Sequence, residues 1–155
     1  LSPRGDASVE IFLEPLPAEP ESGYPGQEYT TVRILGSSAS VSDAVVAQVQ
    51  TILPNATVVR YDGKDRYETA AMLNADVFTG PVHGVTMTNG LRFPDALAGA
   101  PRANVTGGPT VLTRTACVPL ATVGTLDALT PDVVTALGKT DAVSEAALAG
   151  APCGS

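Results

Sequence analysis

From residue 31 onward, short runs rich in β-branched residues alternate with longer alanine-rich segments. The runs are apolar on both faces, which predicts strands, and the segments between them have the length of helices. The predicted strands cover residues 31–35, 57–61, 84–88, 110–113 and 133–137. The predicted helices cover residues 41–53, 66–78, 94–103, 119–129 and 143–149. Because such alternation builds repeated βα units, we expect an α/β fold, a three-layer sandwich with a mostly parallel sheet of about five strands.

Two of the predicted helices have clear start signals. Asp65 and Glu68 fit a capping box, in which Asp65 accepts from the first-turn amides and Glu68 reaches back. Pro94 suits the first position of its helix, and Asp95 suits the positive end of the helix dipole. We therefore expect structural roles for Asp65, Glu68 and Asp95.

The first 30 residues differ from the rest of the chain. They contain five prolines, and six carboxylates against Arg4 alone, which is a net charge of −5 out of −7. We predict an extended acidic, Pro-rich arm over residues 1–30 and one domain over residues 31–155. Only 16% of the residues are charged, so a nucleic-acid-binding surface is not expected. No run approaches the roughly 18 to 20 apolar residues of a membrane span, and we expect a soluble, processed product.

One supersecondary unit is used twice in the sequence. Leu-Gly at 35–36 followed by VSDA at 41–44 recurs as Leu-Gly at 137–138 followed by VSEA at 143–146, at a constant offset of 102 residues. A fixed offset across a strand, a glycine turn and a helix start indicates an internal repeat. We interpret residues 31–53 as the tail of a preceding repeat and residues 57–150 as one full repeat.

Two cysteines, Cys117 and Cys153, are an even number in a chain with little other sign of metal or thiol chemistry. This favours a disulfide bond and an oxidising compartment. The alternative is a pair of small apolar side chains that never meet.

Three segments carry a resemblance to a known family, the cell wall binding repeat 2 modules of Gram-positive bacteria. They are GKDRYETA at 63–70, NGLRFPDALA at 89–98 and the twice-used Leu-Gly turn before Val-Ser. Their order and spacing also resemble the family over roughly residues 31–150. Actinobacterial members are the most similar, because some have cysteines at the places of Cys117 and Cys153.

The resemblance implies a Rossmann-like or Toprim-like fold and non-covalent anchoring to anionic wall polysaccharides, which means an extracellular location at the cell wall or surface. An apolar tripeptide is tied to ligand binding in that family, and Thr110, Val111 and Leu112 stand in its place here. Family modules usually occur in threes with pseudo-threefold symmetry. Because this chain holds one full repeat, a threefold arrangement would require identical chains to form a homo-oligomer.

The residues themselves point to an anion-binding edge. In a parallel sheet the strand-to-helix loops emerge at one edge, where helix N-termini direct free amides outward. Five of the nine basic residues lie in or beside these loops: Lys64, Arg66, Arg92, Arg114 and Lys139. Arginine forks and amides together suit phosphate or carboxylate groups. Aspartates occupy the same loops, so a structural pair of Arg66 with Asp95 is the preferred alternative for that residue, whereas Arg92 and Arg114 are expected to contact a ligand or another subunit.

Catalysis has little support in the sequence. The sole histidine, His83, opens a predicted strand at the end opposite the basic loops. Nucleophile-elbow, phosphate-loop, dinucleotide and zinc motifs do not occur, so we expect no enzyme activity, no cofactor and no metal. We expect a binding module for an anionic wall polymer. The alternative is a self-assembling structural subunit of an extracellular surface layer or filament, suggested by the single repeat, the leftover half-repeat and the arm.

Overall fold

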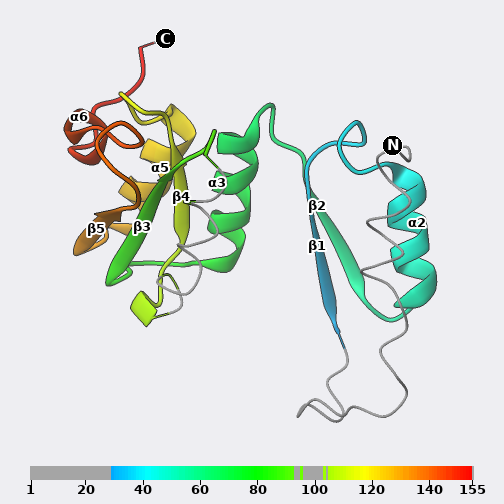
Figure 1. Ribbon diagram of the computed structural model, residues 1–155. Helices are drawn as coiled ribbons and strands as arrows, with labels where there is room; N and C mark the ends of the chain where they lie inside the picture. Colours follow the sequence, from blue (N-terminus) through cyan, green and yellow to red (C-terminus); the bar gives the residue numbers. More distant parts are fainter. Residues whose placement is uncertain (1–28, 93–94, 96–102, 104, 155) are drawn as a thin grey trace. The chain divides into compact units, whose positions relative to one another are not determined.

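The computed structural model describes residues 29–92, 95, 103 and 105–154 (Figure 1). The chain forms two compact units, Leu1–Asp62 (unit 1) and Gly63–Ser155 (unit 2). The predicted arm lies outside the described residues except for Tyr29 and Thr30, and so does most of the predicted helix at 94–103. No helix in the described part of the chain is long and apolar enough to cross a membrane.

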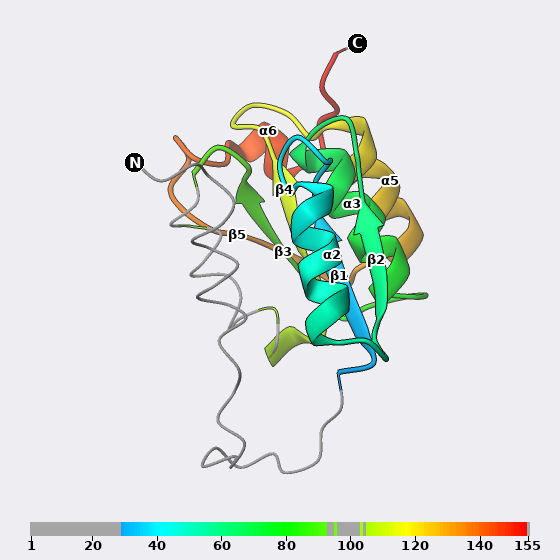
Figure 2. The same ribbon diagram turned by 90° about the vertical axis from the view of Figure 1, so that its right-hand side faces the viewer.

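Unit 1 contains one βαβ element: β1 (Thr31–Leu35), α2 (Asp43–Ile52) and β2 (Thr57–Tyr61). The two strands are parallel, and α2 runs alongside them (Figure 2). The helix begins where the Ser42 side chain accepts a hydrogen bond from the Val45 amide, and it buries Val45 and Val49.

Arg60 joins β2 to the start of α2 within unit 1. Its guanidinium donates to the carbonyls of Gly36 and Val41 at 2.8 and 3.0 Å and pairs with Asp43 at 3.2 Å. The side chain of Arg60 is 21% exposed, so this cation is largely withdrawn from solvent. Arg60 therefore closes the β1–α2 turn from the neighbouring strand.

Unit 2 is built on a three-stranded parallel sheet with the order β4-β3-β5. Its elements are α3 (Arg66–Val77), β3 (Gly84–Asn89), β4 (Thr110–Thr113), α5 (Leu120–Leu129), β5 (Val133–Ala136) and α6 (Glu145–Leu148). Every residue of β3 is buried, as expected for the central strand of a covered sheet. The helices α3 and α5 lie side by side in both views (Figures 1 and 2).

The core of unit 2 joins the sheet to α6 and to the segment after β4. Three residues of the sheet, Val85, Met87 and Val111, pack with Val118, with Val143 just before α6 and with Ala147 of α6. All six are at most 5% exposed. Burying each valine or methionine side chain supplies roughly 1.5–3 kcal/mol, and the single methyl group of Ala147 supplies less, so this cluster contributes strongly to the stability of the unit.

The predicted class, α/β with parallel strands, is confirmed, but the single sheet of about five strands is wrong. The five strands form one sheet of two and one of three. Both edges of β3 are occupied, by β4 and β5, while β1 pairs with β2 alone in the described residues. The Rossmann-like description therefore applies only loosely, to a short three-stranded sheet.

The two Leu-Gly turns of the sequence have the same local structure. Residues 36–43 (the first turn) begin with Gly36 at φ +112°, and residues 138–145 (the second turn) begin with Gly138 at φ +94°. L-residues rarely adopt such angles, which explains the glycine in both places. A Cβ on Gly36 would lie 3.0 Å from the Cβ of Ser40, and one on Gly138 would lie 2.8 Å from the Cβ of Ala142.

The hydrogen bonds of the two turns also correspond. The Ser37 carbonyl accepts from the amides three and four residues later, those of Ser40 and Val41. The Lys139 carbonyl accepts in the same way from the amides of Ala142 and Val143. Each turn then ends at a serine N-cap, Ser42 for α2 and Ser144 for α6. Equivalent residues are 102 positions apart throughout, so the sequence similarity corresponds to one backbone conformation used twice.

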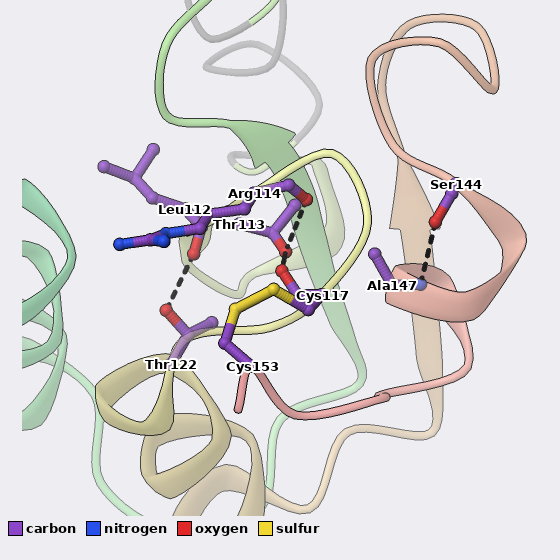
Figure 3. Close-up of a disulfide and its surroundings, with 8 residues drawn as sticks. All are labelled: Leu112, Thr113, Arg114, Cys117, Thr122, Ser144, Ala147 and Cys153. Atoms are coloured by element: carbon purple, nitrogen blue, oxygen red, sulfur yellow. Dashed lines mark hydrogen bonds between the residues drawn. A yellow bond between two sulfur atoms is a disulfide. The ribbon is translucent and has the colours of Figure 1, made fainter. Parts of the chain in front are cut away.

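The predicted disulfide between Cys117 and Cys153 is confirmed (Figure 3). It joins the loop after β4 to the segment after α6. Backbone bonds reinforce the link, because the Val118 amide donates to Ala151 and the Cys153 amide donates to Val118, at 2.8 and 2.9 Å. The segment after α6 is therefore held against residue 118.

Candidate functional site

The loops that follow β3, β4 and β5 lie at one edge of the unit 2 sheet, because the three strands are parallel. The first turn of α3 joins this edge through contacts with Gly90 and Arg114. We call the basic residues of these segments the cationic edge: Lys64, Arg66, Arg92, Arg114 and Lys139. All five belong to unit 2, and all five are exposed.

Asn89, at the end of β3, ties the loops of the edge together. It is 2% exposed, and its amide group donates to the Thr115 hydroxyl at 2.9 Å and to the Ala142 carbonyl at 2.7 Å. Its side-chain oxygen accepts from the Leu91 amide at 2.8 Å. One side chain thus fixes the loop after β3, the loop after β4 and the second turn.

The start of α3 is fixed by two carboxylates. Asp65 is the N-cap and accepts from the amides of Tyr67 and Glu68, both at 2.9 Å. Glu68 reaches back to the Lys64 amide at 2.8 Å, one residue before the position of an ideal capping box. These bonds hold Lys64 and Arg66 on either side of the cap.

Arg66 binds a backbone carbonyl of the neighbouring loop. Its guanidinium donates to the Gly90 carbonyl at 2.6 Å. The expected pair with Asp95 is not among the ion pairs of the described residues. The Asp95 carboxylate instead lies beside Gly138, where an added Cβ would come within 2.9 Å of it. Arg66 therefore helps to hold the loop after β3 through an uncharged acceptor. This contact does not neutralise the positive charge of its guanidinium.

Arg114 lies over the ring of Tyr67, with the guanidinium carbon 5.7 Å from the ring centroid. Its loop is closed at the base, because the Thr113 hydroxyl and the Arg114 amide both donate to the Cys117 carbonyl, at 3.0 and 3.1 Å. Figure 3 shows the Arg114 side chain extending away from the disulfide. Stacking on a ring face leaves the outward N–H groups of a guanidinium available to a ligand.

Arg92 and Lys139 differ in their surroundings. Arg92 pairs with Asp141 at 3.2 Å, with the two side chains 48% and 65% exposed. Lys139 has its carbonyl in the second turn and its side chain exposed. The charge of Arg92 is thus partly compensated within the chain, whereas no ion pair of Lys139 occurs among the described residues.

The tripeptide Thr110, Val111 and Leu112 forms most of β4. Val111 is 2% exposed in the core. The flanking carbonyls anchor two helices, since Thr110 accepts from Asn74 of α3 at 3.3 Å and Leu112 accepts from Thr122 of α5 at 2.7 Å. In this conformation the tripeptide supports the Arg114 loop from inside the unit.

Sequence reasoning did not assign a role to Asn89, although it lies in a segment that carries the family resemblance, and it interpreted Tyr67 as a packing residue, not as the ring beneath Arg114. An Asn-Gly pair at the end of a buried strand was the available signal for Asn89.

The part of the chain that the structure describes contains no group of three His, Cys, Asp or Glu residues suited to a metal ion. His83 pairs with Asp132 at 3.2 Å, and both side chains are about three-quarters exposed.

Comparison with known proteins gives one family. Residues 60–148, more than half of the chain, match the cell wall binding domain 2 (CWB2) family. No curated protein matches the sequence. Among solved structures, Cwp8 from Clostridium difficile shares the fold with a TM-score of 0.58 and 21% identity over 77% of this chain. The chain spans 20% of the length of Cwp8. The chain belongs to the cell wall binding domain 2 family.

Proposed function

We propose that unit 2 holds an anionic cell-wall polymer through the cationic edge, without chemistry on the polymer. Family membership implies non-covalent binding to the cell wall and a location at the cell wall or cell surface. The observation that supports the finer proposal is the gathering of five of nine basic residues on one edge of an acidic chain. Anionic polymers meet their largest local attraction at such an edge.

Within the edge, Arg114, Lys64 and Lys139 are the residues that we assign to polymer contact. Arg114 is exposed and stacked on Tyr67, so its planar fork is pre-oriented. The two lysines are exposed point charges on either side of it in the sequence. Arg66 and Arg92 have partners in the chain, the Gly90 carbonyl and Asp141, and we assign them mainly to positioning the loops.

The role of the tripeptide follows from its burial. Because Val111 is in the core, we assign Thr110, Val111 and Leu112 to holding the Arg114 loop rather than to direct contact. A substitution in this strand is expected to weaken binding by displacing Arg114. The functional residues of the edge would then be on loops, supported by a rigid strand.

The test is retention of the full chain on purified cell walls, before and after chemical removal of the anionic polymers. Arg114→Gln removes one positive charge and the ring stacking but keeps hydrogen-bonding groups. We expect roughly tenfold weaker retention, the loss typical of one charge-assisted hydrogen bond, and weaker binding of the unaltered chain at high salt.

Gln48→Glu is the matched control, because it changes the net charge by the same amount at an exposed position of α2 in unit 1. Equal retention of the two variants would exclude Arg114 from the site. Undiminished retention on walls without anionic polymer would overturn the proposal for the polymer class.

A second candidate, a self-assembling structural subunit, is favoured by one observation. The second turn repeats the backbone of the first. The strand before the first turn, β1, pairs with the strand that follows it, whereas among the described residues β5 pairs with β3 alone, so one edge of β5 is left for another chain.

A further inference from the structure

We infer that the outer edge of β5 docks a parallel strand of the β2 type, with an arginine at the place of Arg60, supplied by another chain of the same family. The inference is independent of the cationic edge. It rests on the correspondence between the first and second turns and on what each turn has beside it.

The two strands that precede the turns have different neighbours. β1 pairs with β2, which follows it in the chain, while β5 pairs with β3, which precedes it. β1 and β5 are equivalent under the offset of 102 residues. Among the described residues, β1 has a following strand beside it but no preceding one, and β5 has a preceding strand beside it but no following one. The edge of β5 that has no partner strand among the described residues is the one that corresponds to the β2 side of β1.

The backbone hydrogen bonds establish this correspondence between the two edges. In a strand, successive residues direct their N–H and C=O groups to opposite edges. Gly36 donates to Tyr61 of β2 at 2.8 Å, so even-numbered residues of β1 face β2. Val133 and Leu137 donate to His83 and Met87, at 3.0 and 2.9 Å, so odd-numbered residues of β5 face β3. The outward residues of β5, namely Val134, Ala136 and Gly138, are thus the equivalents of Val32, Ile34 and Gly36.

The acceptors for an arginine are also repeated. In unit 1, Arg60 binds the carbonyls of Gly36 and Val41 and the carboxylate of Asp43. The equivalent groups in the second turn are the carbonyls of Gly138 and Val143 and the carboxylate of Glu145, which is exposed. Among the described residues, none brings a guanidinium to these three groups. The site therefore has the charge and the backbone geometry that Arg60 finds in unit 1.

The segment after α6 does not fill this position. In unit 1 the chain continues from α2 into β2, which returns along β1. After α6 it turns at Gly150, and Ala151 and Cys153 bond to Val118, next to the disulfide. Val118 follows β4, and β4 lies on the opposite side of β3 from β5. A β2-type strand from a second chain is the occupant that we propose, because β2 pairs with the equivalent strand β1 and carries the arginine that the first turn binds.

The docking mode is addition of a strand to a sheet edge, in which main-chain bonds give affinity and side chains give selectivity. Here selectivity would come from the arginine, which is fourth in the β2 sequence TVVRY. The expected register places Tyr61 of the incoming strand opposite Leu137, as it lies opposite Leu35 in β1.

The experiment titrates a synthetic peptide of residues 55–62 into the full, isotope-labelled chain and follows backbone amide resonances. We expect shifts of Val134, Ala136 and Gly138 rather than of β1 amides. Glu145→Lys should weaken binding roughly fivefold or more, given the modest strength of an exposed ion pair together with the added repulsion. The peptide with Arg60→Glu should bind poorly to the unaltered chain and recover binding to the Glu145→Lys chain.

A second variant keeps the test decisive. Ala136→Pro removes an N–H that faces outward, which an edge strand tolerates, and it should abolish the amide shifts while the chain stays folded. Absence of shifts in β5 with the unaltered chain would overturn the inference. So would shifts in β1 that respond to Asp43→Lys and not to Glu145→Lys, because the peptide would then be replacing β2 in unit 1.

Discussion

Asn89 is the residue on which the geometry of the edge most depends. It is buried, and its side chain makes three hydrogen bonds to three different segments. No apolar residue of that size can satisfy the Leu91 amide and the Ala142 carbonyl together. Loss of the side chain leaves buried polar groups without partners, which costs more than the bonds themselves contribute.

Asn89→Ala is therefore expected to lower the free energy of unfolding by about 2–3 kcal/mol, measured by urea denaturation. Asn74→Ala is the matched control, since Asn74 is also buried but its amide makes one long bond, to the Thr110 carbonyl at 3.3 Å. A loss for Asn89→Ala no larger than the loss for Asn74→Ala would contradict a linking role.

At the scale of elements, the N-terminus of α3 connects helix stability to the site. Asp65 accepts two first-turn amides, and Glu68 bonds the Lys64 amide. The same turn places Tyr67 under Arg114 and Arg66 against Gly90. A frayed first turn would thus loosen the support of Arg114 as well as the helix.

Asp65→Ala should lower the free energy of unfolding by about 1 kcal/mol, because the helix loses its N-cap acceptor. Asp65→Asn should stay within a few tenths of a kcal/mol of the unaltered chain, since asparagine caps about equally well. Urea denaturation measures both. Equal losses for the two variants would mean that the carboxylate charge, rather than the capping oxygen, stabilises α3.

For the whole molecule, the disulfide decides how the last segment is held. Cys117 and Cys153 are 36 residues apart, and the loop that they close contains α5, β5 and α6. The bond restricts the unfolded chain over much of unit 2, and in the folded state it joins the Arg114 loop to the segment after α6.

Reduction is expected to lower the free energy of unfolding by about 3–4 kcal/mol, from the loop-closure entropy of that length. Urea denaturation with and without a thiol reductant measures the change. The double variant Cys117→Ser, Cys153→Ser should be weakened to a similar extent and be insensitive to the reductant. A loss below about 1 kcal/mol on reduction would show that the backbone bonds around Val118 suffice alone.

The sequence by itself determined the positions of the strands and helices that are described, together with the Asp65 cap and the twice-used turn. These features depend on residues a few positions apart: the apolar alternation of a strand, the Asp65 cap, the glycines that adopt positive φ. The disulfide was predictable because only two cysteines were present to pair.

Tertiary structure alone decided which strands share a sheet and which acceptor each arginine finds. β3 pairs with β4 and β5 on its two edges, so the expected sheet of five strands divides. Arg66 binds the Gly90 carbonyl, and no ion pair with Asp95 occurs among the described residues. Asn89 meets partners 26 and 53 residues away. Local patterns fix backbone conformation, but such pairings depend on competition between segments distant in sequence, which no local pattern records.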